Sequence, residues 1–346
     1  MQYGDAYDVS LLNAISHLRF PYNQMEKSYP AVINGPRFVH RWLYYSTNSR
    51  RRSWIVRVLL RISGRKMAEV VLRDHAADVY VSCSPMYSQI IPWYMRRQNS
   101  NAQFVAVATD MVSGHTTNYA PDADYTITPT EHARREALQN GVDPARAFVM
   151  GQPVWPDLRE RMAHGPATRA ELGFNTSIPL VLLIGGGDGM GKLGQAAQAV
   201  AQSKLPLQLA VVCGRNQVVR QALDQLQAHV PMQTLGFVTN VPELMGAADI
   251  LITKAGAATV GEAFIAGLPM LFYDMVPGQE EGNVAYAVKE GAGVWCPTPQ
   301  ALVGQLSDLM AHPERHEQMR AASQRLAYPN SALDIARFVA GLCDLS

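Results

Sequence analysis

The sequence predicts an α/β protein built from two doubly wound domains. Short apolar runs alternate with amphipathic stretches along the chain, which is typical of parallel strands joined by helices. The length of 346 residues fits two domains of ordinary size. Hydrophobic residues make up 48% of the chain and charged residues 17%, which excludes disordered, collagen-like and coiled-coil proteins.

The first domain is expected to span residues 1–152. An early strand is predicted at Tyr7–Leu11, where the chain reads YDVSL. The periodicity then predicts buried strands and intervening helices in this order: strand Asp78–Cys83, helix Tyr87–Gln98, strand Gln103–Thr109, strand Asp124–Thr128 and helix Thr130–Asn140.

A proline-rich connector over residues 153–168 separates this domain from a second one at residues 169–330. Residues 331–346 are expected to form a helix that packs back on the first domain. The second domain carries a longer series of buried runs, each followed by helix-like sequence. Strands are predicted at Leu180–Ile184, Gln208–Cys213, Met232–Leu235, Asp249–Thr253 and Pro269–Tyr273.

Charge and cysteine content limit the function classes. Residues 1–150 carry 17 Lys/Arg against 12 Asp/Glu, and residues 151–346 carry 13 against 17, for a net charge of +1. The four cysteines form no CxxC pair, so neither a zinc ribbon nor a disulfide scaffold is expected, and the natural setting is a reducing cytoplasm. No run approaches the roughly 18 apolar residues of a membrane span. Any membrane association is therefore expected to be peripheral, on the cytoplasmic face.

A glycine-rich turn follows the strand Leu180–Ile184. Glycines in such a turn let backbone N–H groups approach a phosphate at the positive end of a helix. The spacing Gly186-x4-Gly191-Lys192 nearly spells a Walker A loop, but Leu193 stands where a magnesium-binding Ser or Thr is required, which excludes an NTPase. The alternative is a tight turn without a ligand.

Two further polar segments follow strands of the same domain. Thr253–Ala263 opens a helix with small residues and places Glu262 one turn inside it, where a carboxylate suits ribose hydroxyls. The loop Asp274–Asn283 offers donors and acceptors suited to sugar hydroxyls. An exposed glutamate on a capped helix and a solvated turn are the alternatives. All three segments lie at the carboxyl ends of strands, where ligands of doubly wound folds bind.

These motifs carry a family resemblance. The series GGGDGMG (185–191), CGRN (213–216), LGF (235–237), ITKAGAATVGEAFIAGLP (252–269) and PGQEEGN (277–283) resembles the donor domain of the monogalactosyldiacylglycerol synthase family, which includes bacterial diacylglycerol glucosyltransferases. In the first domain, Met25–Tyr29 and Val107–Asp110 followed by His115 resemble the acceptor domain of that family.

The resemblance implies a GT-B fold, with two Rossmann-like domains facing a cleft, and an inverting transfer of galactose or glucose from a UDP-sugar to diacylglycerol. Gly236, Phe237 and Val238 would face the uracil, Glu262 the ribose, and Gln279 with Glu280 the hexose. The second domain, which would bind the donor, has no DxD motif, so no metal and no other cofactor is expected. The diphosphate would be met by the segment from Lys254 to Thr259 and by Arg215. The remaining donor-binding candidates are Gly186, Gly187, Asp188, Gly189, Met190, Gly191, Ala255, Gly256 and Asn283.

Two residues of the first domain are candidates for the reaction itself. Inversion by direct displacement requires a general base beside the acceptor hydroxyl. Asp110 ends a buried strand at the expected cleft edge and is the candidate base, although it could also orient the acceptor or cap a turn. His115 is a candidate for contact with the acceptor or an anionic lipid.

The chain departs from the family pattern at three places. Ala257-Ala258 replaces the usual Pro-Gly, and Asp188 stands where Glu is common. The first strand, GGGH loop and first helix of the family have no counterpart. The two explanations are a start that lies further upstream, which we favour, and an inactive UDP-sugar- or lipid-binding pseudoenzyme. A UDP-GlcNAc-dependent transferase acting on a lipid-linked acceptor and a UDP-sugar epimerase are the alternative enzymes.

The stretch Ser49–Lys66 predicts a basic amphipathic helix. Arg50, Arg57, Arg61 and Arg65 are expected along one side of it, with Trp54 beside them. Such a helix suits the anionic surface of a bilayer, where diacylglycerol resides. Interleaved apolar residues and a nearly neutral chain argue against a nucleic-acid partner. The alternative is a core-facing helix with a solvated cationic face.

Overall fold

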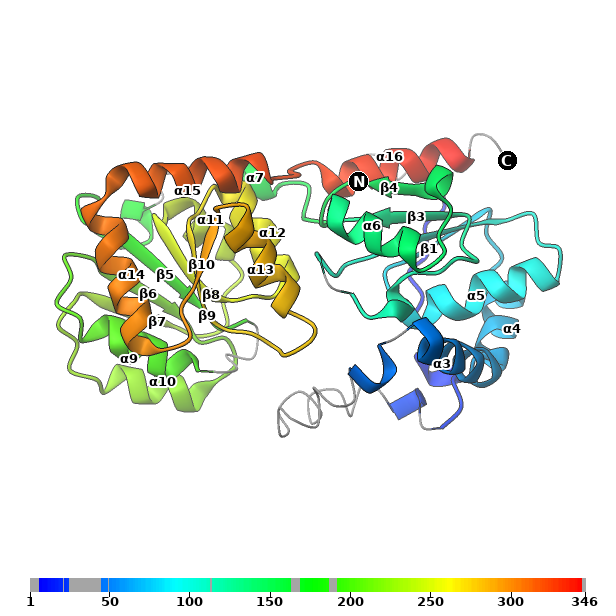
Figure 1. The fold of residues 1–346 in the computed structure, drawn as a ribbon, viewed down its shortest axis with the longest axis horizontal. Helices are drawn as coiled ribbons and strands as arrows, with labels where there is room; N and C mark the ends of the chain where they lie inside the picture. The colour runs from blue at the N-terminus through cyan, green and yellow to red at the C-terminus, as the bar shows by residue number, and fades with distance from the viewer. Residues whose placement is uncertain are drawn as a thin grey trace.

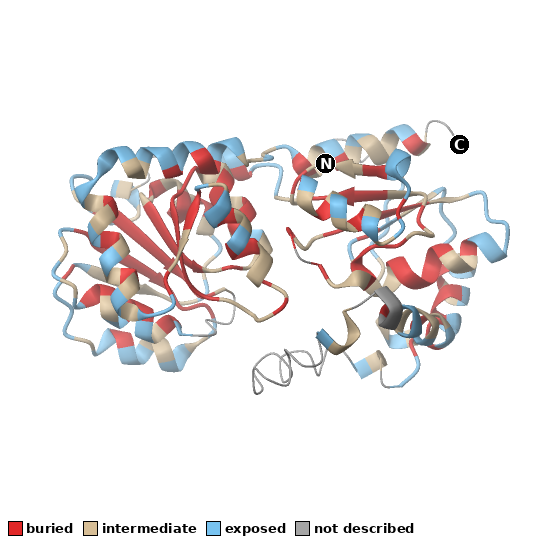
Figure 2. Ribbon diagram, viewed as in Figure 1, coloured by how far each residue is buried: buried red, intermediate tan, exposed pale blue. Residues whose placement is uncertain are grey.

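The computed structural model describes residues 6–20, 22–24, 45–48, 50–112, 114–162, 169–186 and 192–343. Two parallel sheets, each covered by helices, form the centres of two domains (Figure 1). Buried residues are concentrated in the strands of both sheets (Figure 2). The α/β class predicted from the alternation of apolar and amphipathic segments is confirmed.

The first sheet has four strands within the described residues, all parallel and in the order β1-β2-β3-β4. Their bounds are β1 Val79–Ser82, β2 Gln103–Val107, β3 Tyr125–Thr128 and β4 Ala147–Val149. The helical elements around them are η1 Ile15–His17, η2 Tyr22–Gln24, α3 Arg50–Ser63, α4 Arg65–Asp74, α5 Pro85–Arg97, η3 Thr116–Asn118, α6 Glu131–Gln139 and η4 Pro144–Arg146.

The second sheet has six parallel strands in the order β10-β9-β8-β5-β6-β7. Their bounds are β5 Leu180–Ile184, β6 Gln208–Val212, β7 Met232–Leu235, β8 Ile250–Lys254, β9 Met270–Asp274 and β10 Gly293–Trp295. Strand order runs outward in both directions from the β5–β8 pair, so a topological switch point lies there. The loops after β5 and β8, which carry the predicted phosphate-binding segments, therefore leave the sheet beside the expected ligand crevice.

Two apolar clusters fill the faces of this sheet. One packs beneath α9, α10 and α14, and the other beneath α7, α11, α12 and α13. Burial on both faces explains why β5, β6 and β9 read as uninterrupted apolar runs. The helix bounds are α7 Leu158–Met162, α9 Leu193–Ala201, α10 Gln217–Asp224, α11 Val241–Ala247, α12 Ala257–Ala266, α13 Glu281–Lys289, α14 Pro299–Ala311 and α15 Pro313–Arg325.

The last helix, α16 (Ser331–Cys343), packs on the first sheet, although it follows the second domain in the chain (Figure 1). Ile335 and Leu342 join the buried cluster of β2 and β3. The Phe338 ring lies 5.2 Å from the Tyr125 ring and 5.3 Å from the Phe148 ring. The chain thus crosses between the domains twice.

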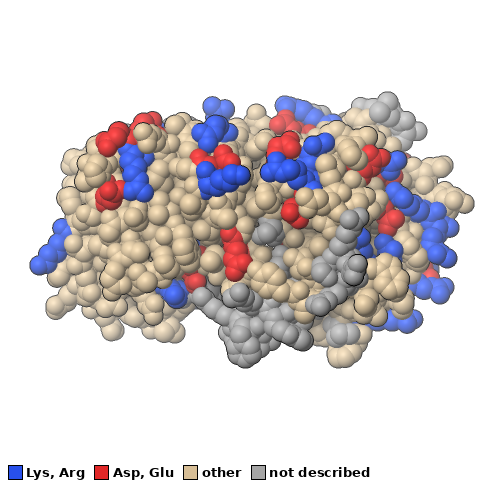
Figure 3. Space-filling view, in the orientation of Figure 1, with Lys and Arg blue, Asp and Glu red and all other residues tan. Residues whose placement is uncertain are grey.

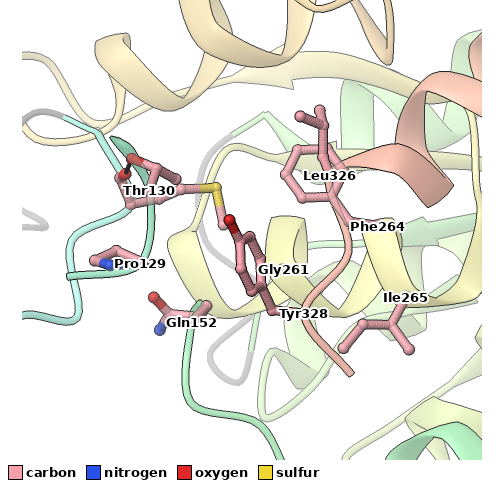
Figure 4. A pocket seen from close by; sticks show the side chains of 9 residues that line it. Pro129, Thr130, Gln152, Gly261, Phe264, Ile265, Leu326 and Tyr328 are labelled. Atoms are coloured by element: carbon pink, nitrogen blue, oxygen red, sulfur yellow. Dashed lines mark hydrogen bonds between the residues drawn. The ribbon is translucent and has the colours of Figure 1, made fainter. Parts of the chain in front are cut away.

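A small cavity lies where the two crossings meet (Figure 4). Thr130 comes from the first domain, Phe264 from α12 and Tyr328 from the second crossing. α12 approaches the first crossing closely at Gly261, where a Cβ would lie 3.1 Å from the Gln152 side chain. The other lining residues are Met111, Pro129, Gln152, Ile265 and Leu326.

Three expectations about the elements need correction. Tyr7–Leu11 is not a strand: it has no strand partner within the described residues, and Val9 and Leu11 lie in solvent. The short strands β4 and β10 were not predicted, because three residues are too few to show a period. The predicted helix Ser49–Lys66 divides at Gly64, where a Cβ would lie 2.5 Å from the Ile90 side chain.

Candidate functional site

The candidate site lies where the loop after β2 faces the loop between β9 and α13. Asp110 follows β2 of the first domain, and Gln279 precedes α13 of the second. The Gln279 side chain faces the Asp110 carboxylate across the domain boundary and lowers its pKa. On the same side of the site, the Tyr45 hydroxyl donates to Glu281 Oε2 at 2.7 Å. The loops of both domains therefore meet directly at this point.

The Asp110 carboxylate is half-buried and held from two sides. Asn118 Nδ2 donates to Asp110 Oδ2 from within the first domain, and the Gln279 amide approaches from the second. Burial raises the pKa of Asp110 above its usual range and the nearby Glu280 charge adds to this rise, whereas the Asn118 and Gln279 amides oppose it. A carboxylate with a raised pKa at a domain boundary is suited to accept a proton.

Glu280 is bound inside the second domain. Its Oε1 lies 2.8 Å from Lys254 Nζ, and its Oε2 accepts a hydrogen bond from the Val276 backbone N–H at 2.7 Å. The register between β8 and β9 shifts at Thr253/Lys254, an irregularity that sets the direction of the lysine. The ion pair therefore joins the end of β8 to the loop after β9.

Asn283 makes a second connection between these segments. Its Nδ2 donates to the Ala255 carbonyl at 2.9 Å, and the residue is buried. Glu280 and Lys254 were expected to face the hexose and the diphosphate. In this structure they bind each other, and Asn283 fixes the loop that carries Gln279.

The start of α12 presents backbone N–H groups to the site. Gly256 occupies the N-cap position in an extended conformation and offers no side-chain cap, and no acidic residue lies in the first turn. The first turn contains Ala257 and Thr259, which are both half-buried. An uncapped helix N-terminus with small residues leaves room for an anion.

Arg215 and Phe237 lie at the ends of β6 and β7. The Arg215 guanidinium stacks over the Phe237 ring at 4.7 Å from its centroid, and both side chains are exposed. Gly236 precedes the ring, and a Cβ there would lie 3.0 Å from Arg220 Nη1. Val238 packs against the core. An exposed aromatic ring at this edge is suited to stack on a planar base.

The glycine-rich turn is described only at its start and end. Gly186 adopts φ +76°, a left-handed conformation that favours glycine. The predicted residues Gly187, Asp188, Gly189, Met190 and Gly191 lie outside the described residues, as does the segment Met25–Tyr29.

Glu262 is half-buried on α12, and burial raises the pKa of its carboxyl from 4.5 to about 6. Folding therefore favours the protonated form, and the free energy of unfolding should fall as the pH rises from about 4.5 to about 6. Glu262→Gln, which cannot ionise, should gain about 1 kcal/mol over the wild type between pH 5 and pH 7.5.

Urea unfolding at both pH values measures this difference. The exposed Glu171→Gln serves as the control and should show the same stability relative to the wild type at both pH values. An equal effect of Glu262→Gln at pH 5 and pH 7.5 would contradict the assignment.

His115 makes hydrogen bonds within the first domain, and its expected contact with an acceptor or an anionic lipid stays a prediction. Its Nδ1 accepts from the Thr117 backbone N–H, and its Nε2 lies 3.0 Å from Thr47 Oγ1. Burial, together with the nearby Arg57 charge, lowers the pKa of His115 from 6.5 to about 4. The neutral ring caps η3 and ties it to residues 45–48.

Two of the arginines that were expected along one outer side of α3 bind groups of the protein instead. Arg57 Nη2 donates to the carbonyls of Thr116 and Tyr119, and Arg61 binds Asp122 with only 19% of its side chain exposed. Arg65 begins α4 and pairs with Glu69 in solvent. The Arg50 side chain lies outside the described residues. Buried carbonyls and a carboxylate from other segments attract the arginines inward.

The exposed face of α3 is apolar instead. Trp54 is 65% exposed and Ile62 58%. Ile55 and Leu59 lie between them on the same face and are also exposed. No helix in the described ranges is long and apolar enough to cross a bilayer. In that same part of the chain, no three His, Cys, Asp or Glu side chains are grouped as metal ligands.

Sequence reasoning missed Asn118 and the Asp110–Gln279 contact. Asn118 lies only eight residues after Asp110, and its position in the same loop was the available signal. The pairing of Asp110 with Gln279 depends on how the domains meet, which no local pattern records.

Comparison with solved structures places the fold. A. baumannii MurG matches with a TM-score of 0.61 at 18% identity, covering 81% of this chain and 79% of that one. A UDP-GlcNAc 2-epimerase from Neisseria meningitidis matches with a TM-score of 0.59 at 15% identity, covering 85% and 82%. These neighbours confirm the two-domain GT-B architecture.

Comparison of sequences places the family. Residues 1–154 match the model of monogalactosyldiacylglycerol (MGDG) synthase, and residues 180–335 match the glycosyltransferase family 28 C-terminal domain. A probable monogalactosyldiacylglycerol synthase 3 from Oryza sativa is 32% identical over 97% of this chain and 68% of its own length. Monogalactosyldiacylglycerol synthase 3 from Arabidopsis thaliana is 31% identical over 97% and 75%. The chain therefore belongs to the monogalactosyldiacylglycerol synthase family of glycosyltransferases.

Proposed function

We propose that this protein transfers galactose or glucose from a UDP-sugar to diacylglycerol with inversion, forming a β-glycosyl diacylglycerol. The observation that carries the proposal is the contact between Asp110 of one domain and Gln279 of the other. This proximity supports the proposal, because a carboxylate that could accept the acceptor proton lies beside an amide that could bind the donor sugar. The names of the plant relatives, which specify a monogalactosyl lipid, support galactose.

In the proposed reaction the diacylglycerol hydroxyl attacks the anomeric carbon as the bond to the diphosphate breaks. An alcohol of high pKa loses its proton only as the new bond forms, and Asp110 accepts that proton. Gln279 releases Asp110 and binds the hexose. UDP leaves as a dianionic or trianionic group, and its charge is stabilised by the first turn of α12, by Lys254 and by Arg215.

The rest of the donor is assigned by position. The exposed Phe237 ring, flanked by Gly236 and Val238, stacks near the uracil, and Glu262 binds the ribose hydroxyls. A carboxylate binds both hydroxyls best when ionised, so donor affinity increases above pH 6. Amides, a lysine and an arginine around the diphosphate support transfer without a bound metal.

A transfer assay tests the proposal. The purified chain is mixed with diacylglycerol in phosphatidylglycerol vesicles and with labelled UDP-galactose, UDP-glucose or UDP-GlcNAc, in EDTA. We expect label in the lipid phase from one of the two hexose donors. Incorporation from UDP-GlcNAc alone would overturn the hexose assignment, and UDP binding without any transfer would identify a pseudoenzyme.

We further propose that the protein docks peripherally on the cytoplasmic face of a membrane through the apolar face of α3. Diacylglycerol is available only within a bilayer, and a helix with an exposed Trp and aliphatic side chains suits the headgroup boundary. Arg65, Lys66 and Arg97 are exposed on the neighbouring helices α4 and α5. Figure 3 shows cationic side chains gathered at that end of the first domain. The free cysteines within the described residues fit a reducing compartment.

Trp54→Glu combined with Leu59→Glu should reduce binding to phosphatidylglycerol vesicles at least tenfold, because two charges would enter the headgroup boundary. Co-sedimentation measures the bound fraction. Val218→Glu is the matched control, since Val218 is 78% exposed on α10 of the other domain. Equal losses in the control, or none in the double variant, would place the docking surface elsewhere.

A further inference from the structure

Asn118 is the residue of the first domain that holds the Asp110 carboxylate. It ends η3, is only 8% exposed, and donates from Nδ2 to Asp110 Oδ2. The amide has little room to move. A Cβ at Gly114 would lie 2.7 Å from the Asn118 Nδ2, so glycine at that position makes space for the contact.

The turn that carries Asn118 is fixed from several sides. Gln89 Nε2 donates to the carbonyls of Thr117 and Tyr119 at 2.7 and 2.9 Å. Arg57 binds the carbonyls of Thr116 and Tyr119, and the Asn118 N–H donates to the His115 carbonyl at 2.7 Å. A turn held by this many buried hydrogen bonds keeps its side chains in one arrangement.

The two amides beside Asp110 come from different domains. Gln279 approaches from the second domain, so its effect on the carboxylate depends on how the two domains meet. Asn118 lies in the same domain and the same loop as Asp110. Its hydrogen bond to the carboxylate therefore does not depend on the position of the second domain.

The charges around Asp110 make the hydrogen bond from Asn118 important for the ionisation of this carboxylate. Glu280 of the donor-side loop disfavours a second negative charge, although Lys254 partly neutralises it. On the first domain, His115 is neutral and Arg57 is bound to η3 carbonyls. A hydrogen bond donated to the ionised carboxylate opposes both burial and the repulsion from Glu280.

We propose that Asn118 is a positioning residue for transfer, which keeps Asp110 ionised and directs one carboxylate oxygen toward the acceptor hydroxyl. This inference rests on the proposed function of Asp110 as the base. Asn118 itself touches neither substrate, and it acts through the carboxylate that it binds.

The pH dependence of transfer in Asn118→Ala tests this role. We expect kcat to fall at least tenfold at pH 7, with the acidic limb of the kcat profile moved up by about one pH unit. The KM for the UDP-sugar should stay within twofold. Asn118→Asp should move the limb further up, because two adjacent carboxylates share one proton. Asn140→Ala is the control. It removes a part-buried side-chain amide that donates to a backbone carbonyl of α6, and it should leave the pH profile of kcat unchanged.

A titration that needs no activity accompanies the kinetics. The full chain is labelled with 13C-carboxyl aspartate, the Asp110 signal is assigned with Asp110→Asn, and its pKa is measured in wild type and Asn118→Ala. We expect a higher pKa in the variant. The role of Asn118 alone would be overturned if Asn118→Ala transferred sugar at the wild-type rate, with the acidic limb of its kcat profile and the pKa of Asp110 both unchanged. Absence of wild-type transfer would overturn the proposed function, while the titration would still decide the contact.

Discussion

Asp110→Asn should lower kcat/KM for transfer by a factor of about 10² to 10⁴ while leaving UDP binding unchanged. The amide matches the carboxylate in shape but cannot accept the acceptor proton. Asp110 belongs to the first domain, whereas the residues assigned to UDP belong to the second. Initial rates of label transfer, together with calorimetric titration of UDP, separate the two effects.

Asp78→Asn is the matched control for this loss. Asp78 is an exposed carboxylate just before β1 in the same domain, and its replacement should retain full activity. A variant at Asp110 that keeps more than a tenth of wild-type activity would exclude this carboxylate as the base. A matching loss of UDP affinity would instead indicate a disturbed cleft.

Lys254→Met should reduce the free energy of unfolding by about 3 kcal/mol. The lysine and glutamate side chains of this ion pair are only 16% and 9% exposed, so removal of one leaves the other buried without its partner. Glu280 would keep its hydrogen bond to Val276, which satisfies one oxygen but does not neutralise the charge. Urea unfolding at pH 7.5 measures the change.

The double variant Lys254→Met/Glu280→Gln should recover most of this stability, because no uncompensated charge remains. The exposed pair Arg325–Glu290 is the comparison: Arg325→Met should cost less than about 1 kcal/mol. If the double variant is as unstable as the single one, the loss comes from packing and not from the unpaired carboxylate.

Local pattern was sufficient to predict most of the sheets. The strands β2, β5, β6 and β9 are short buried apolar runs, and their length favours strands over helices. Tyr7–Leu11 also carries apolar residues, but within the described residues it has no neighbouring strand to supply hydrogen bonds, which a short window of sequence cannot reveal. β10 is too short to be distinguished from a loop.

The site was predictable at the level of segments but not of contacts. Glycines and polar residues after strands identify the crevice, since the carboxyl ends of parallel strands meet at one edge. The direction of Arg57 and Arg61 was not predictable, because their partners are carbonyls and a carboxylate about 60 residues away. Amphipathicity shows that a helix has two faces, but it does not show which face meets the protein.

The position of α16 affects the order in which the protein can mature during translation. The first domain leaves the ribosome early, yet the apolar cluster that the described residues form on β2 and β3 stays incomplete until Ile335 and Leu342 have been synthesised. The second domain, encoded between them, is complete before that time. The half of the molecule that is made first is therefore finished last, and the nascent chain carries an incomplete apolar cluster on its first sheet while the second domain is being made.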